Sequence, residues 1–147
     1  MADYRETVDY ILSIPLFAQK IGKENLSSLL CRLGNPERSI PAVHVAGTNG
    51  KGSTCRALAQ MLTDKGYKVG LFISPHLVTI NERIQIDGVN ISDDDFVWAF
   101  ETVKAQFTQH PSFFEVMFAM AAVYFQKQGC DFAVYELSLI HISEPTR

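Results

Sequence analysis

The sequence predicts an α/β domain of three layers, in which helices cover both faces of a mostly parallel sheet. Two observations support this prediction. Short apolar runs that suit strands alternate with segments whose apolar residues recur at helical spacing. A glycine-rich turn also joins one of these runs directly to the helix that follows it. Strand, turn, helix and strand in this order form a βαβ unit, whose two strands are parallel.

The first half of the chain supplies this unit and two helices before it. Residues 3–13 and 25–33 carry apolar residues at helical spacing, and a Gly-Asn-Pro triplet stops the second helix. Residues 42–46 form a short β-rich run. A helix should follow the glycine-rich turn as far as about residue 65, and residues 69–73 predict the next strand. This run is continuously apolar, which favours a strand buried on both faces.

A hairpin and a further strand are expected in the second half. Residues 84–86 and 89–91 flank the pair Asp87-Gly88, which suits a two-residue type I′ turn. Residues 132–136 form a third candidate for a parallel strand.

Two helices are expected between the hairpin and this strand. Ser92 precedes the first helix and suits its N-cap. Ser112 and Glu115 have the spacing of a capping box at the start of the second, which should run to about residue 128.

Residues 137–147 do not continue this pattern. After a strand we expect a turn and another helix, but the chain reads Leu-Ser-Leu-Ile-His-Ile-Ser-Glu-Pro-Thr-Arg. This peptide resembles a translated sequencing-library adaptor, which ends many unrelated predicted proteins. We interpret it as a non-native tail with no functional role, and we expect the natural gene to continue past Glu136. Resequencing of the source locus tests this, because eleven genuine codons there would contradict the interpretation.

Composition excludes several classes of protein. The formal net charge is −3, so no basic footprint for nucleic acid is present. No apolar run is long enough to span a bilayer, and the polar start of the chain does not suit a secretory signal. Cys31, Cys55 and Cys130 are scattered, which indicates reduced thiols rather than a disulfide framework or a zinc site. We therefore expect a cytoplasmic protein without nucleic-acid or membrane partners.

The strongest motif is the glycine-rich turn between residues 42–46 and the following helix. Its glycines let the backbone approach a ligand closely, and the N–H groups at the helix start form a cradle for an anion. A lysine in this position places a cation on the β- and γ-phosphates, and a hydroxyl group after it can hold Mg²⁺. The residues predicted to bind a nucleotide are Gly47, Thr48, Asn49, Gly50, Lys51, Gly52, Ser53 and Thr54.

This turn departs from the strict P-loop pattern GxxxxGK[ST]. Val45 stands where the first glycine should be, and Gly52 follows the lysine. A tight turn with no ligand is the alternative interpretation. The strand–loop–helix context favours phosphate binding.

Polar residues also follow or end two of the other predicted strands. Ser74, Pro75 and His76 come directly after residues 69–73, and Glu136 ends the run 132–136. In open parallel sheets, ligands bind beyond the carboxyl ends of the strands. Each feature alone is compatible with an ordinary strand end, and a lone histidine is more often a surface or packing residue. A buried carboxylate is costly unless it is paired or bound to a metal.

Together these motifs resemble a known family. The segments Ala-Gly-Thr-Asn-Gly-Lys-Gly-Ser (46–53), Ser-Pro-His-Leu (74–77) and Asn-Glu-Arg-Ile (81–84) are similar to those of folylpolyglutamate and dihydrofolate synthases, in the Mur ligase superfamily. The Gly-Lys-Gly-Ser form points to the folate branch, since the peptidoglycan branch more often has Gly-Lys-Thr-Thr. The resemblance implies a truncated, Mur-ligase-like P-loop fold. Residues 1–136 would be an incomplete N-terminal ATP-binding domain, with the smaller C-terminal domain absent.

The resemblance also implies a reaction and its residues. ATP and Mg²⁺ would activate a carboxylate of folate or dihydropteroate as an acyl phosphate, which the amine of L-glutamate attacks. The full-length enzyme would be a monomer, and the fragment alone inactive. Lys51 would be catalytic, and Ser53, Ser74 and Glu136 would lie near magnesium. The residues implied around the substrate are Ser74, Pro75, His76, Arg83 and Phe114, although an apolar helix residue such as the last belongs first to a core.

Three alternatives remain open at this point. A Mur-type ligase would act on a peptidoglycan precursor. A P-loop switch protein would hydrolyse a nucleotide to regulate a partner, but neither a guanine-specificity motif nor a conventional GK[ST] is present. The chain as given could also be a non-functional gene fragment, which is compatible with the ligase interpretation.

Overall fold

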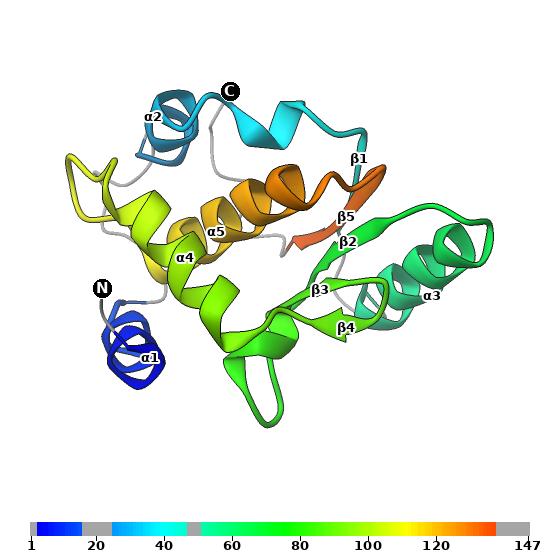
Figure 1. Cartoon of the computed structure of the whole chain (residues 1–147), viewed down its shortest axis with the longest axis horizontal. Coiled ribbons are helices and arrows are strands. Elements are labelled where there is room, and N and C mark those ends of the chain that lie inside the picture. The colour runs from blue at the N-terminus through cyan, green and yellow to red at the C-terminus, as the bar shows by residue number, and fades with distance from the viewer. Residues whose placement is uncertain (1–2, 16–24, 47–50, 138–147) are drawn as a thin grey trace.

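A single mixed sheet with helices on both of its faces forms the framework of the chain (Figure 1). The structure is a computed structural model and describes residues 3–15, 25–46 and 51–137. The strands lie in the order β1-β5-β2-β3-β4. They comprise β1 (Ala42–Ala46), β2 (Val69–Phe72), β3 (Ile84–Ile86), β4 (Val89–Asn90) and β5 (Phe132–Leu137).

The helices lie close to their predicted positions. Within the described residues, the short 3₁₀ helices Pro36–Arg38 and Ile80–Arg83 accompany them. The α-helices are α1 (Tyr4–Leu12), α2 (Asn25–Arg32), α3 (Lys51–Asp64), α4 (Asp93–Lys104) and α5 (Phe113–Gln128). None of the helices in the described part of the chain has the length and apolar character needed to cross a membrane.

The sheet separates two hydrophobic clusters, which confirms the predicted three layers. On one face, Phe72 and Tyr135 pack with α4, α5 and the first two helices. On the other face, Leu71 and Val134 pack against α3. Strand β2 is buried at all of its positions, as its continuous apolar run predicted. The alternation of side chains along β2 and β5 therefore supplies both cores at once.

Strand pairing is parallel in one half of the sheet, among β1, β5 and β2, and antiparallel in the other half, among β2, β3 and β4. Strands β1 and β2 both pair in parallel with β5, which lies between them. The predicted βαβ unit is confirmed, but its two strands are not hydrogen-bonded neighbours. The predicted hairpin is also confirmed, because Asp87 and Gly88 have φ values of 51° and 81°, as a type I′ turn requires.

Local capping explains where α4 and α5 begin. The hydroxyl group of Ser92 accepts a hydrogen bond from the backbone N–H of Asp95 at 3.1 Å. Ser112 and Glu115 form the predicted capping box, in which the Glu115 carboxylate accepts from the backbone N–H of Ser112 at 2.8 Å. Gly129 ends α5 in the left-handed conformation, with a φ of 69°.

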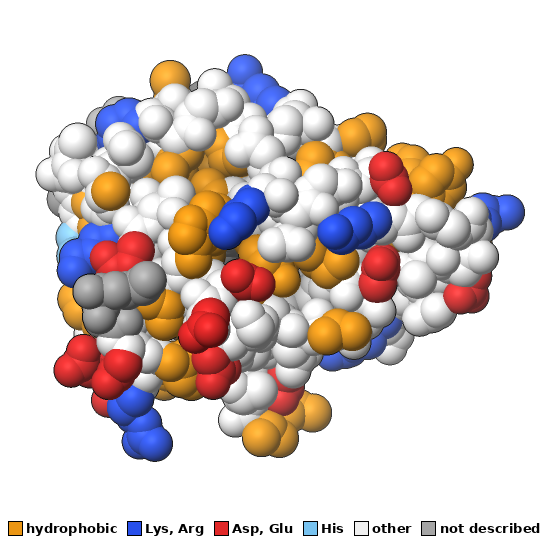
Figure 2. All heavy atoms as spheres, in the orientation of Figure 1, with side chains coloured by type: hydrophobic (Ala, Val, Ile, Leu, Met, Phe, Trp, Pro, Cys, Tyr) orange, Lys and Arg blue, Asp and Glu red, His pale blue; other side chains and the backbone are white. Residues whose placement is uncertain are grey.

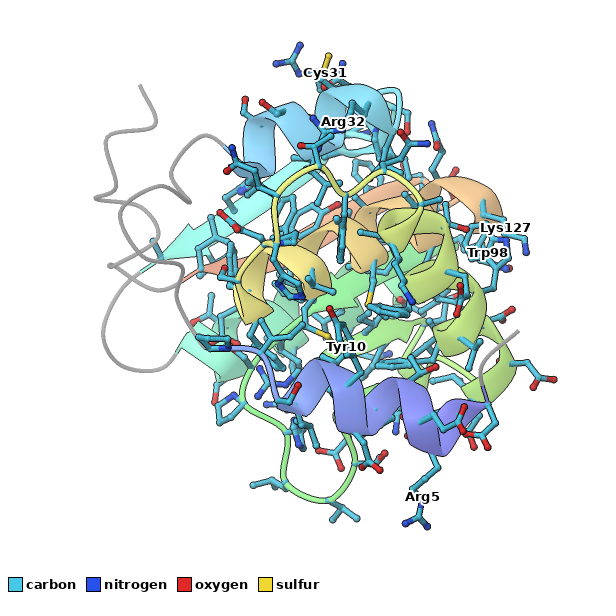
Figure 3. All side chains as sticks on the ribbon, turned by 90° about the vertical axis from the view of Figure 1, so that its left-hand side faces the viewer. Arg5, Tyr10, Cys31, Arg32, Trp98 and Lys127 are labelled. Carbon is cyan, nitrogen blue, oxygen red and sulfur yellow. The ribbon has the colours of Figure 1, made fainter. Side chains whose placement is uncertain are left out.

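The surface of the helical layer also carries ordered side-chain contacts. In Figure 3, Trp98 of α4 and Lys127 of α5 lie side by side, and the ammonium group is 4.0 Å from the indole ring centroid. Tyr10 of α1 points toward the rest of the molecule, whereas Arg5 points away from it. The ring of Tyr10 packs against Phe100 at 5.6 Å between centroids. These contacts fix the helices that cover one face of the sheet.

Gly70 allows α5 to pack directly on β2. A Cβ atom at this position would lie 2.5 Å from Cδ1 of Phe125, whose side chain is fully buried. We expect Gly70→Ala to destabilise the protein by about 1–3 kcal/mol, because a packed ring cannot move away freely. Thermal melting measures this. The double variant Gly70→Ala/Phe125→Leu should recover part of the loss, and a simple sum of the two single effects would contradict the direct clash.

Candidate functional site at the carboxyl ends of the parallel strands

The three parallel strands end along one edge of the sheet. In the register of β1 and β5, Val45 lies beside Glu136 and Ala46 beside Leu137. Phe72 at the end of β2 pairs with Tyr135 on the other side of β5. Glu136 is therefore placed between the exits of β1 and β2, where a parallel sheet binds its ligands.

Glu136 extends its carboxylate toward the exit of β2. Its side chain is 8% exposed, and its Oε1 accepts a hydrogen bond from the backbone N–H of Ser74 at 3.1 Å. The structure thus brings together two of the three residues predicted to lie near magnesium. The side chain of Ser74 is itself exposed, so its hydroxyl group is accessible from the edge of the sheet.

Ser53, the third residue predicted to lie near magnesium, follows the glycine-rich turn in the first turn of α3. Residues 47–50 and the side chain of Lys51 lie outside the described residues. Helix α3 begins at Lys51, and Ser53 and Thr54 are exposed in its first turn, while Gly52 is half-buried. The turn therefore connects the end of β1, beside Glu136, with the N-terminus of α3.

Arg83 joins the two ends of the segment that follows β2. Its Nε donates a hydrogen bond to Nδ1 of His76 at 2.8 Å, and its guanidinium carbon lies 5.0 Å from the ring centroid of Phe113. The Ser74–Pro75 peptide bond, just before His76, is cis. Two predicted substrate residues, His76 and Arg83, are thus in direct contact.

The electrostatic surroundings favour a neutral imidazole in this pair. Burial lowers the pKa of His76, and the positive charge of Arg83 lowers it further, while Glu82 opposes the shift. Because Nδ1 accepts from Arg83, the proton of the neutral ring is on Nε2. Burial also lowers the pKa of Arg83, and the charge of Glu136 opposes that shift, which indicates that the carboxylate acts electrostatically on the guanidinium group.

Phe114 lies within an aromatic cluster with Phe72 and Phe118. Its ring is 6.0 Å from that of Phe72 and 5.8 Å from that of Phe118, measured between centroids. The residue is half-buried, so part of it remains accessible. The guanidinium group of Arg83 lies over the ring of the neighbouring Phe113, which was not among the predicted site residues.

The oxygen atoms at this edge suit magnesium. The described residues contain no group of three or more His, Cys, Asp or Glu side chains that could hold a metal ion by themselves. Magnesium usually takes one or two carboxylates together with water and substrate phosphates. Glu136 and the hydroxyl group of Ser74 are oxygen ligands of this chemical kind, and the sequence predicts that the hydroxyl group of Ser53 joins them.

The fold is that of an α/β domain with a mostly parallel sheet, and comparison with known proteins shows which proteins the chain is similar to. A dihydrofolate synthase/folylpolyglutamate synthase of Bacillus subtilis is 39% identical over 92% of the chain, which covers 34% of the relative. A folylpolyglutamate synthase of Lacticaseibacillus casei is also 39% identical, over 93% of the chain and 34% of the relative. No protein-family model matches the chain.

A solved structure agrees with these relatives. An FPGS–AMPPCP–folate complex superposes with a TM-score of 0.87 at 38% identity, over 92% of this chain and 35% of the other. The chain belongs to the folylpolyglutamate and dihydrofolate synthase family. It spans about a third of the length of the curated relatives it matches.

Proposed function

We propose that the full-length protein is an ATP-dependent ligase that joins L-glutamate to a carboxylate of a folate or of dihydropteroate. The γ-phosphoryl group of ATP passes to a carboxylate oxygen and yields ADP and an acyl phosphate. The amine of glutamate then attacks the acyl carbon, the amide bond forms, and phosphate leaves as the amine loses a proton. The names of the relatives support this reaction.

The observation that best supports the proposal is the position of Glu136. Its buried carboxylate lies at the ligand-binding edge of the sheet and accepts from the backbone of Ser74. Phosphoryl transfer depends mainly on positioning and on neutralising the charge of the phosphates. Mg²⁺, when bound, would supply much of that neutralisation, and Glu136, Ser74 and Ser53 would hold it.

We assign the remaining predicted residues to the two substrates. The turn from Gly47 to Gly50 and the start of α3 cradle the phosphates, with Lys51 as the cation and Thr54 beside it. On the other side of the edge, Pro75, His76 and Arg83 face the substrate that carries the pteridine ring. Phe114 is a weaker member of this set, because its ring already packs with Phe72 and Phe118.

We further propose that the full-length enzyme works as a cytoplasmic monomer without nucleic-acid or membrane partners. The chain has a formal net charge of −3. On the face in Figure 2, lysine and arginine side chains are scattered among acidic ones and do not form a basic patch. A nucleic-acid partner would require such a patch.

The decisive test is product formation by the full-length gene product. We expect ADP release that depends on both L-glutamate and the pteridine substrate, and a product whose mass has increased by one glutamyl residue. Folate and dihydropteroate are compared as acceptors, which shows whether the enzyme adds the first glutamate, later ones or both. Nucleotide hydrolysis that ignores glutamate would favour the switch protein, and activity only with a peptidoglycan precursor would favour the Mur-type ligase.

The chain of 147 residues is expected to be inactive by itself. It spans about a third of its relatives, and in the described residues β1 is an edge strand whose Val43 is 37% exposed. An exposed parallel edge with apolar side chains also favours aggregation. The same ligation assay on the purified chain, with the full-length protein as its positive control, tests this. Any folate–glutamate product from the chain alone would contradict it.

A further inference from the structure

The tip of the loop between β2 and the 3₁₀ helix Ile80–Arg83 projects from the molecule. The loop lies at the lower edge of Figure 1, and Figure 2 shows hydrophobic atoms protruding there. Leu77 and Val78 are 91% and 88% exposed. Burial of these aliphatic side chains therefore cannot determine the conformation of the loop.

A single carboxylate binds the backbone of this loop. Oε1 of Glu82 accepts a hydrogen bond from the N–H group of Leu77 at 2.8 Å, and Oε2 accepts from those of Val78 and Thr79, both at 3.0 Å. Three successive N–H groups that converge on one anion form a nest. The N–H group of Glu82 also donates to the carbonyl oxygen of Thr79 at 3.0 Å. The hydrogen bonds from Leu77 and Thr79 are the main causes that lower the pKa of Glu82.

The residues on either side of Glu82 in the 3₁₀ helix are held by hydrogen bonds. Asn81 is 4% exposed and donates from Nδ2 to the carbonyl oxygen of Ile91 at 2.7 Å and to the carboxylate of Asp93 at 3.1 Å. On the other side, Arg83 holds His76. The 3₁₀ helix is thus anchored to the start of α4, and the loop is attached to it through Glu82.

We propose that Glu82 is a positioning residue that keeps residues 77–79 in the conformation that receives the pteridine substrate. The inference rests on the proposed function. Glu82 acts through the loop, since its carboxylate oxygens bind backbone N–H groups. Its removal should weaken capture of that substrate and leave nucleotide binding unchanged.

The test compares Glu82→Ala, Glu82→Gln and the control Glu101→Ala, which removes an acidic residue from α4, in the full-length gene product. We expect Glu82→Ala to raise the KM for the pteridine substrate about tenfold, because three hydrogen bonds to a charged group are lost. The KM for ATP and kcat should stay close to wild type. Glu82→Gln retains one acceptor oxygen and should recover part of the effect, and Glu101→Ala should show none.

Amide hydrogen exchange provides a readout that does not depend on turnover. Protection of the Leu77, Val78 and Thr79 amides should fall in Glu82→Ala and remain in Glu101→Ala. Unchanged protection would overturn the inference, and so would lost protection with an unchanged KM for the pteridine substrate. A wild-type protein without ligase activity would overturn the proposed function, while the exchange data would still show whether Glu82 orders the loop.

Discussion

Replacing Lys51 by alanine is expected to lower glutamate-dependent ADP release by the full-length protein about 100-fold or more, because an ammonium group on the phosphates stabilises the charge of the transferred group. Lys51 is the first residue of α3 and follows the glycine-rich turn directly. The helix itself should persist, since alanine favours it. Turnover is measured together with thermal melting, which separates lost chemistry from lost folding.

Lys65→Ala is the matched control for this variant. Lys65 follows the same helix at its other end and is exposed, so its removal changes the net charge equally without approaching the turn. We expect normal turnover from it. Lys51→Arg retains the charge with a larger, planar group and should recover only part of the activity. Near-normal turnover by Lys51→Ala would remove the assignment of this turn as the phosphate site.

Elements that depend on local chemistry were predictable from the sequence. The hairpin follows from Asp87-Gly88, because both residues adopt the left-handed conformation that a type I′ turn needs. The starts of α4 and α5 follow from Ser92 and Ser112, whose side chains bind the N–H groups of the first turn. In each case the signal and the structure that it specifies lie within a few residues.

The order of the strands was not predictable in the same way. Strand β5 enters between β1 and β2, although about 60 residues and a hairpin separate it from β2 in sequence. The packing of α5 on the sheet determines this strand order. Helix α5 is buried along most of its length, and its Phe125 sits directly on Gly70 of β2. Such a contact joins two distant segments and leaves no periodic signal in either one.

Some contacts of the candidate site could also be predicted from the sequence, and others could not. The meeting of Glu136 with Ser74 could be expected, because parallel strands present their carboxyl ends at a common edge. The contact of Arg83 with Phe113 and the hydrogen bonds of Glu82 could not, since both depend on how a turn folds back. Glu82 belongs to the Asn-Glu-Arg-Ile segment that carried the family resemblance, so a signal was present without its physical reason.

Removing the charge of Glu136 tests the metal site with little change of shape. In Glu136→Gln the amide oxygen can still accept from the N–H group of Ser74, so we expect the strand ends to stay in place. The variant loses the anionic oxygen that suits Mg²⁺ and the charge that acts on Arg83. We expect ligation to fall about 100-fold and the Mg²⁺ concentration for half-maximal rate to rise.

Glu115→Gln provides the control, because Glu115 is equally buried, at 8% exposed, but serves the capping box of α5. Glutamine also suits that position of the box, so this variant should keep both its turnover and its Mg²⁺ dependence. The rate of ADP release is measured across a Mg²⁺ titration for the wild type and both variants. If Glu136→Gln required no more Mg²⁺ than the wild type, Glu136 would be an element of structure that holds the exit of β2, and the magnesium ligands would have to be sought elsewhere in the full-length protein.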